Sequence, residues 1–346
     1  MRAAVTRAPG AIEVVDVAEP TAPGPGEVIV RSEAVGICGS DYHFLLGELS
    51  EAAGGGASPF PKIQGHEVAG TIEALGPDCR PELELGARVA LYPLHACGHC
   101  YPCAIGRPNT CDNFTLIGIH LDGGLQQLLR IPQEQVFPIA EGDSAVAAMA
   151  EPVSIAVRAV HRARIEAGEH VVVLGAGPIG QCVCLLARER GAEVLVVDLQ
   201  ERRLSLSREM GAEGLVWSDA NAVVRAARDW AGNGGPPVVV DATGVAAAVG
   251  AMVEMVASAG RAVQVGMSNE VVPLRIGSLT EKELDLLGVS CCGGGDFAEA
   301  VAAVERNTAM IAQLISHEFP LERAPEAIEF AIEHPAEVMK VVIRVN

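Results

Sequence analysis

The chain has 346 residues, of which 49% are hydrophobic, 20% are charged and 3% are aromatic, and its formal net charge is −19. This acidity argues against nucleic acid or an anionic membrane as a partner, and so few aromatic side chains leave little surface for stacking on bases. No apolar run reaches the roughly 18–20 residues of a membrane helix, and the N-terminus lacks the apolar stretch of a signal peptide, so we expect a cytoplasmic protein of about two domains.

The first region, up to about residue 152, is rich in glycine and proline and carries short alternating apolar runs. Strands are predicted at residues 27–32, 67–72, 88–91 and 127–131. Many short strands between turn residues are typical of a β-rich, barrel-like domain. A run of three glycines at 54–56 predicts a flexible loop.

Strand-like and helix-like patterns alternate from about residue 153 to 288. Strands are predicted at 171–174, 194–197, 238–240 and 262–265, and helices at 179–190, 201–210 and 246–258. Continuous apolar strands separated by helices predict a parallel sheet that is covered on both faces. From residue 289 onward we expect helices at 296–305 and 324–333 and a strand at 340–345.

A glycine-rich turn joins the first strand of the second region to its helix. Its residues are Gly175, Ala176, Gly177, Pro178, Ile179 and Gly180. This pattern between a strand and a helix, with Asp198 ending the next strand, predicts a dinucleotide site whose pyrophosphate lies at the helix N-terminus. Asp198 can accept hydrogen bonds from ribose hydroxyls and would repel a 2′-phosphate, which favours NAD over NADP. Arg202 and Arg203 weaken that preference, and an ordinary glycine-rich turn is the alternative interpretation.

Four cysteines crowd into one short segment, in the pattern C-x₂-C-x₂-C-x₇-C. They are Cys97, Cys100, Cys103 and Cys111. Four thiolates suit a closed tetrahedral zinc site with no position for water, so the predicted role is structural. An iron–sulfur cluster and free buried thiols are the alternatives. Ferredoxin-type patterns use other spacings and a proline after the fourth cysteine, where this chain has Asp112.

A second set of possible metal ligands is dispersed along the chain: Cys38, His66, Glu67 and Glu151. A cysteine, a histidine and a carboxylate can hold zinc and leave a fourth position open for water or substrate. Spacing alone does not link residues so far apart. Taken singly, Cys38 is typical of a buried thiol, and Glu151 before Pro152 is typical of an acidic residue at a helix start.

Together these residues resemble the zinc-containing medium-chain dehydrogenase/reductase family, in its branch of sorbitol, threonine and hexonate dehydrogenases. The motifs are Gly36-Ile37-Cys38-Gly39-Ser40-Asp41-Tyr42-His43, Gly65-His66-Glu67, the four-cysteine segment, Glu151-Pro152 and the glycine-rich turn. The resemblance spans nearly the whole chain. It implies an α/β protein with a GroES-like catalytic domain at 1–152 and 289–346, which carries a zinc lobe at about 95–112. A Rossmann NAD-binding domain with a doubly wound parallel sheet would occupy 153–288.

The resemblance also implies roles for the dispersed residues. Cys38 and His66 would bind a catalytic zinc, with Glu67 and Glu151 as the two carboxylates near it, either of which can be the direct ligand. Ser40 and His43 would relay the substrate proton to solvent. The expected cofactors are two zinc ions per chain and NAD. Zinc lowers the pKa of a bound hydroxyl, so an alcohol can lose its proton near neutral pH while hydride passes to nicotinamide.

Only a weaker resemblance narrows the choice among substrate classes. Residues 97–109 and 118–124 resemble bacterial L-gulonate and L-galactonate 5-dehydrogenases, which indicates a secondary alcohol of a polyol or sugar acid. Many such relatives carry an arginine after the strand at 286–290, where this chain has Cys291-Cys292. An arginine favours a carboxylate, so its absence weighs against an acidic substrate unless Arg107 or Arg158 supplies the charge.

Other interpretations stay open. Threonine, butanediol and simple polyols are alternative substrates, and His120 is a candidate substrate contact. Zinc-free quinone reductases and non-enzymatic relatives are alternative function classes, against which the intact ligand set argues. Cys291 and Cys292 are interpreted as small buried side chains, with a redox-sensitive pair as the alternative. The family forms homodimers and homotetramers, and residues 284–288 are the expected interface strand.

Overall fold

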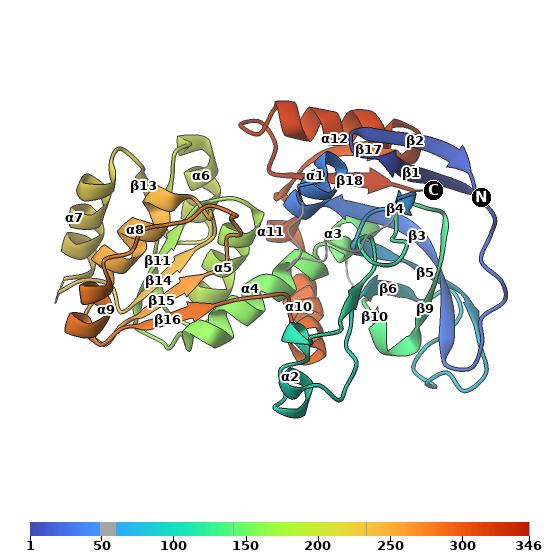
Figure 1. Ribbon diagram of the computed structural model, residues 1–346, viewed down its shortest axis with the longest axis horizontal. Coiled ribbons are helices and arrows are strands. Elements are labelled where there is room, and N and C mark those ends of the chain that lie inside the picture. Colours follow the sequence, from blue (N-terminus) through green and yellow to red (C-terminus); the bar gives the residue numbers. More distant parts are fainter. Residues whose placement is uncertain (49–59, 141, 233, 346) are drawn as a thin grey trace. The chain divides into compact units, whose positions relative to one another are not determined.

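The computed structural model describes residues 1–48, 60–140, 142–232 and 234–345, which form two compact units (Figure 1). The first unit contains Met1–Ser154 and Gly293–Asn346, and the second contains Ile155–Cys292. The chain therefore leaves the first unit once and returns to it. The domain limits expected from the sequence remain a prediction, because units defined by contacts need not be folding domains. The expected loop at 54–56 lies outside the described residues.

The first unit is built on a seven-stranded sheet around β3 (Glu27–Ile37). Its order is β10 (Val136–Pro138), β6 (Arg88–Leu91), β5 (Glu67–Leu75), β3, β18 (Lys340–Arg344) and β17 (Ile315–Pro320), with β9 (Leu128–Pro132) also paired to β3. Both β5 and β18 run antiparallel to β3. The C-terminal strand β18 thus lies beside β3 from near the N-terminus, as the red and blue strands of Figure 1 show. This pairing brings the C-terminal segment of the first unit into the sheet formed by its N-terminal segment.

Smaller elements complete the first unit. A three-stranded sheet has the order β2 (Ala11–Asp16), β1 (Arg2–Ala8) and β4 (Lys62–Ile63). The helices include α1 (Gly39–Leu46), α3 (Ser144–Ala148), α10 (Gly294–Arg306), α11 (Thr308–Ala312) and α12 (Ala324–Glu333). The helix α4 (Ala150–Ala163) begins in this unit and continues into the second. The short elements β7 (Leu94–His95), α2 (Tyr101–Ala104) and β8 (Thr115–Leu116) frame the four-cysteine lobe.

The second unit contains a six-stranded, wholly parallel sheet. Its order is β13 (Glu213–Val216), β12 (Glu193–Asp198), β11 (His170–Leu174), β14 (Val238–Asp241), β15 (Arg261–Gln264) and β16 (Asp285–Gly288). The intervening helices are α5 (Pro178–Glu189), α6 (Glu201–Glu209), α7 (Ala220–Ala231), α8 (Ala246–Met255) and α9 (Ile276–Lys282). The chain starts at β11 and builds outward in both directions, which is the doubly wound Rossmann order. Valines at 171–173 and 238–240 are fully buried, because helices cover both faces.

The predicted fold class is confirmed, and the predicted strands and helices each have a counterpart. The helix expected at 246–258 is shorter, because Val256 adopts extended backbone angles and Ala259 has a positive φ of 58°. The elements β1, β2, α1, α7 and β17, among others, were not predicted from the sequence. Among the described helices, none combines the length and apolar character needed to cross a membrane.

Candidate metal centres and nucleotide site

Cys38, His66 and Glu67 each bring one ligand atom to within 4.8 Å of the others. Cys38 follows the last residue of β3, and His66 and Glu67 stand at the start of β5. The two segments meet because Gly36 pairs with Glu67 in the β3–β5 ladder. Thiolate, imidazole and carboxylate are the donors that zinc accepts in proteins. The donor set therefore fits zinc, as the sequence analysis expected.

Asp41 is a buried partner of this cluster that the sequence analysis did not assign. Its Oδ1 atom lies 3.8 Å from His66 Nδ1, and its Oδ2 accepts a hydrogen bond of 2.9 Å from the Cys38 amide. Burial lowers the pKa of His66, but the carboxylate of Asp41 and the Cys38 thiol outweigh it and raise the pKa well above its usual value. Asp41 thus lies close to two of the candidate ligands, at the first turn of α1.

Lys340 is a second partner that the sequence analysis missed. Its Nζ atom donates to Oε1 and Oε2 of Glu67 at 2.6 and 2.8 Å, and to the carbonyl of Ile37 at 3.2 Å. Lys340 and Glu67 are only 4% and 1% exposed. Burial alone lowers the pKa of Lys340, but the Glu67 carboxylate and the Cys38 thiol raise it above its usual value. The lysine therefore carries its charge inside the protein.

Glu151 supplies a second buried carboxyl from the first turn of α4. Burial raises its pKa to about 7, while His66 opposes this shift and Glu67 adds to it. The charges of His66 and Glu67 therefore both affect the protonation of Glu151. A cation would favour the charged form of this carboxyl, which is the form that binds a metal.

Ser40 and His43 lie one helical turn apart on α1. Ser40 Oγ is half-buried and lies 3.5 Å from His66 Nε2. His43 is exposed, and its Nδ1 lies 3.2 Å from Glu48 Oε2. Residues three positions apart lie on the same side of a helix. Ser40, beside the cluster, and His43, at the surface, are therefore on one side of α1.

The four-cysteine lobe forms a compact set of thiols. All four sulfur atoms lie within 4.8 Å of one another, and Cys100 Sγ is 3.4 Å from Cys103 Sγ and 3.6 Å from Cys111 Sγ. Four sulfurs bound to one zinc at about 2.3 Å would stand roughly 3.8 Å apart, so the observed spacing fits a single ion. Sulfurs this close leave no room for an iron–sulfur cluster between them.

Backbone amides of the lobe donate hydrogen bonds to its sulfur atoms, which favours the thiolate form that binds a metal. The amides of Cys97 and Asn113 each donate to Cys111 Sγ at 3.3 Å. The amides of His99 and Cys100 lower the pKa of Cys97 to about 6, which favours its thiolate form. Burial and the neighbouring Cys100 thiol raise the pKa of Cys103 to about 12. A metal ion would therefore displace protons from the remaining thiols on binding.

The glycine-rich turn of the second unit has the geometry of a dinucleotide site. Gly175 has a φ of 97°, and a Cβ at Gly180 would lie 1.8 Å from the Gly175 carbonyl oxygen. A Cβ added at Gly177 would meet no neighbouring atom within 4 Å, so the turn is open at the start of α5. Asp198 accepts the Ala176 amide at 2.7 Å and the Gln200 amide at 2.8 Å. These features fit a pyrophosphate and a ribose.

Further residues of the second unit surround this turn. Arg203, a predicted cofactor residue, lies in the first turn of α6, and its carbonyl accepts Gln181 Nε2 at 2.8 Å. Asp241, which the sequence analysis missed, ends β14 and accepts the Gly244 amide at 2.8 Å and Gln264 Nε2 at 2.6 Å. The neighbouring Thr243 packs against Gly175.

His120 belongs to a loop that lies against the cluster segment. A Cβ at Gly118 would lie 2.8 Å from backbone atoms of Gly65, the residue before His66. His120 Nδ1 accepts the Leu116 amide at 3.0 Å, which leaves Nε2 as a donor. Lys62 Nζ holds the His120 carbonyl at 2.9 Å, and burial together with the Lys62 charge lowers the pKa of His120.

The segment with two adjacent cysteines ends the second unit. Cys292 is buried and Cys291 is half-buried with a φ of 46°. Arg107 is half-buried in the four-cysteine lobe, and Arg158 is half-buried on α4.

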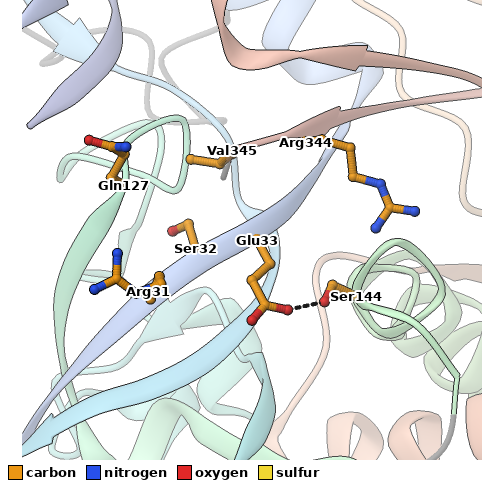
Figure 2. Close-up of a pocket in the computed structure, with 7 residues that line it drawn as sticks. All are labelled: Arg31, Ser32, Glu33, Gln127, Ser144, Arg344 and Val345. Atoms are coloured by element: carbon orange, nitrogen blue, oxygen red, sulfur yellow. Dashed lines mark hydrogen bonds between the residues drawn. The ribbon is translucent and has the colours of Figure 1, made fainter. Parts of the chain in front are cut away.

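A polar hollow of about 400 Å³ lies elsewhere in the first unit (Figure 2). Its lining residues are Arg31, Ser32, Glu33, Gln127, Ser144, Arg344 and Val345. Both of its arginines are already paired: Arg31 with Glu73, and Arg344 with Glu318 and Asp143. The Ser144 hydroxyl donates to Glu33, as the dashed line in Figure 2 marks. None of the candidate ligands lines this hollow.

Two family models match the chain. The alcohol dehydrogenase GroES-like domain matches residues 24–141, and the zinc-binding dehydrogenase model matches residues 178–306. The L-galactonate-5-dehydrogenase of Escherichia coli K12 is 32% identical over 327 residues, which cover 93% of this chain and 92% of that enzyme. The match thus extends over both units.

Two solved structures share the fold over nearly their full length. A short chain alcohol dehydrogenase, RspB, from Escherichia coli CFT073 was crystallised with NADH and is 28% identical, with a TM-score of 0.88 over 100% of this chain and 99% of that one. A protein from Sinorhizobium meliloti 1021 was crystallised with NADP and is 32% identical, with a TM-score of 0.89 over 99% of each chain.

Proposed function

The chain belongs to the zinc-containing alcohol dehydrogenase family, and from this premise we propose that it oxidises a secondary alcohol of a polyol or sugar acid with NAD as the hydride acceptor. As a family member it is a zinc-type alcohol or polyol dehydrogenase. The proposal is carried by one observation, the convergence of Cys38, His66 and Glu67 on one point. An open site with mixed donors is the kind that performs catalysis, whereas a closed site of four thiols is structural.

In this proposal Cys38, His66 and one of the carboxylates Glu67 and Glu151 hold the catalytic zinc, and the four cysteines of the lobe hold a structural zinc. When bound, zinc polarises the substrate hydroxyl as a Lewis acid, and the nicotinamide accepts hydride. Ser40 accepts the substrate hydroxyl proton on Oγ as it gives up its own, and His43 takes up a proton from this relay and releases it to solvent. The positions of Ser40 beside His66 and of His43 on the exposed side of α1 support this route.

The preference for NAD over NADP rests on Asp198. Two backbone amides hold its carboxylate beside the glycine-rich turn. A 2′-phosphate placed next to this charge would be repelled, whereas two ribose hydroxyls can donate to it. Arg203, on the helix that follows, acts in the opposite sense. Because one relative was crystallised with NADP, turnover must be compared with both cofactors.

For the substrate we propose a hexonate oxidised at C5, which follows the L-galactonate-5-dehydrogenase similarity. A neutral polyol is the second candidate, because Cys291 and Cys292 stand where an arginine would recognise a carboxylate. Threonine and butanediol are further alternatives. The Nε2 donor of His120 can bind a hydroxyl in each of these cases.

We also propose that the protein is a homodimer or homotetramer. The strand β16 is an edge of the parallel sheet, and Leu286 in it is 42% exposed. An open apolar edge strand invites pairing with another chain. A second copy that adds its own β16 would continue the sheet across the interface.

The test is NAD⁺ reduction, followed at 340 nm, on L-galactonate, L-gulonate, sorbitol, xylitol, threonine and 2,3-butanediol, with zinc measured on the same sample. We expect two zinc ions per chain and turnover of one sugar acid or polyol. Glu151→Ala should abolish that turnover, and Glu318→Gln, which changes an exposed carboxylate, should not. Turnover with NADP⁺ alone would overturn the cofactor preference. Two zincs without turnover of any compound would overturn the substrate class.

A further inference from the structure

We propose that Asp241 is a positioning residue for the nicotinamide half of the cofactor. Its buried carboxylate joins the loop that follows β14 to the end of β15 and the loop that follows it. The inference rests on the proposed function, because it assumes that the second unit binds NAD. It adds a residue that lies outside the glycine-rich turn and that acts on the other half of the cofactor from Asp198.

The first argument is the number of donors that bind the Asp241 carboxylate, which is 0% exposed. Its Oδ1 atom accepts the Thr243 amide at 3.2 Å and the Thr243 hydroxyl at 2.6 Å. Its Oδ2 atom accepts the Gly244 amide at 2.8 Å and Gln264 Nε2 at 2.6 Å. Hydrogen bonds to a carboxylate are roughly twice as strong as those between neutral groups. One side chain therefore fixes the loop after β14 and ties it to the last residue of β15.

The second argument is the close contact between the two loops. Gln264 Nε2 also donates to the Gly266 carbonyl at 2.7 Å. The amides of Val265 and Gly266 donate to the backbone carbonyl of Asp241 at 2.9 and 3.0 Å. A Cβ at Gly266 would lie only 2.1 Å from the Gly244 nitrogen, so no side chain fits between the loops. The two loops therefore hold one arrangement relative to each other.

The third argument is the place of these loops along the sheet. In the order β12, β11, β14, β15, the last two strands lie on the side of β11 opposite to Asp198, which ends β12. A dinucleotide binds across the carboxyl ends of such a sheet, with its pyrophosphate at the glycine-rich turn. If Asp198 binds the adenosine ribose, the nicotinamide half extends over the ends of β14 and β15. The loop after β14 also adjoins the glycine-rich turn, since a Cβ at Gly175 would lie 2.7 Å from Thr243 Cγ2.

Two ligands separate a role toward the nicotinamide half from a role in general stability. NADH contains both halves of the cofactor, whereas ADP contains only the adenosine half and the pyrophosphate. Isothermal titration calorimetry on the full chain gives the dissociation constant of each. A residue that only stabilises the second unit should affect both ligands alike, whereas a change at Asp241 should weaken the binding of NADH alone.

In Asp241→Asn one carboxylate oxygen becomes an NH₂ group, which cannot accept from the donors that it faces. We expect the dissociation constant of NADH to rise by about 10- to 100-fold, the range for loss of a hydrogen bond to a charged group. The constant for ADP should stay within about twofold of wild type. Asp219→Asn is the matched control. Asp219 accepts the Ala222 amide at 2.9 Å at the start of α7, and its substitution should leave both constants unchanged.

Gly266→Ala tests the same connection from the backbone. The added Cβ would push the two loops apart, so we expect the same selective loss of NADH affinity. Gly250→Ala, in α8, is its matched control, because a Cβ there meets no neighbouring atom within 4 Å. Gln264→Met keeps the length of the side chain but removes its donor. It should show the same selectivity as Asp241→Asn with a smaller loss.

Equal losses of NADH and ADP affinity in Asp241→Asn would show that Asp241 only stabilises the second unit, and the inference would be wrong. Unchanged NADH affinity in Gly266→Ala would also contradict it, because cofactor binding would then not depend on the contact between the loops. Should Asp241→Asn fail to fold, Gln264→Met decides, and equal losses or no loss count against the inference. A wild type that does not bind NADH would overturn the proposed function itself.

Discussion

The two metal-ligand clusters of the first unit are built in opposite ways. The four-cysteine lobe takes all its ligands from residues 97–111, and backbone amides contact its sulfurs. The Cys38 cluster takes its candidate ligands from the end of β3 and the start of β5, and buried side chains, Asp41 and Lys340, lie against it. A closed site therefore needs only a short folded segment. A site with an open position needs the whole sheet to hold its ligands apart.

The largest expected effect is a loss of activity, and it should occur only when a ligand of the Cys38 cluster is removed. Cys38→Ser removes a ligand from the open site, and we expect kcat/KM to fall by at least about 10³-fold, since metal polarisation of the substrate is worth several kcal/mol. The melting temperature should change by only a few degrees, because Cys38 contributes little to the core. Steady-state kinetics and calorimetry on one preparation measure both. A variant that keeps a tenth of wild-type activity would show that Cys38 is not a ligand.

The lobe should show the reverse pattern. Cys100 contacts two other sulfurs, so Cys100→Ser should reduce the zinc content from two ions to one per chain and unfold the lobe locally. Amide exchange across 97–111 should then rise at least about tenfold, which reports local opening. The kcat/KM of the folded variant should stay within about threefold of wild type, a change of less than 1 kcal/mol. Loss of activity equal to that of Cys38→Ser would remove the distinction between the clusters.

The same contrast explains what the sequence could predict. The four-cysteine lobe can be predicted from the spacing of its cysteines, because these candidate ligands are neighbours along the chain. The parallel sheet is predictable because its apolar strands and glycine-rich turn follow local rules. The dispersed candidate ligands could be proposed only through family resemblance, since no local pattern connects residue 38 with residue 151. Lys340 and Asp41 were missed because only the pairing of β18 and β5 with β3, and the first turn of α1, bring them to the cluster.

Asp41→Asn tests the side chains around the open site and should have an intermediate effect. The amide keeps the shape and can still accept the Cys38 amide, but it removes the charge that faces His66. We expect metal affinity at the catalytic site to fall by about 10- to 100-fold, as for other outer partners of metal-bound histidines. Competition with a chelator gives the value. Asp112→Asn, on the exposed surface of the lobe, is the matched control and should leave both sites unchanged.

Asn113→Ala is the counterpart of Asp41→Asn in the lobe and should have the smallest effect. The Asn113 side chain is exposed, and its Nδ2 lies 4.0 Å from Cys97 Sγ, whereas its backbone amide donates to Cys111 Sγ at 3.3 Å. The substitution removes only the weak contact, and alanine retains the amide. We therefore expect a change in unfolding free energy within about 0.5 kcal/mol, as for ordinary surface substitutions, and no loss of zinc. Urea denaturation measures it. A loss as large as that of a cysteine ligand would mean that side chains also stabilise the lobe, and the contrast with the open site would fail.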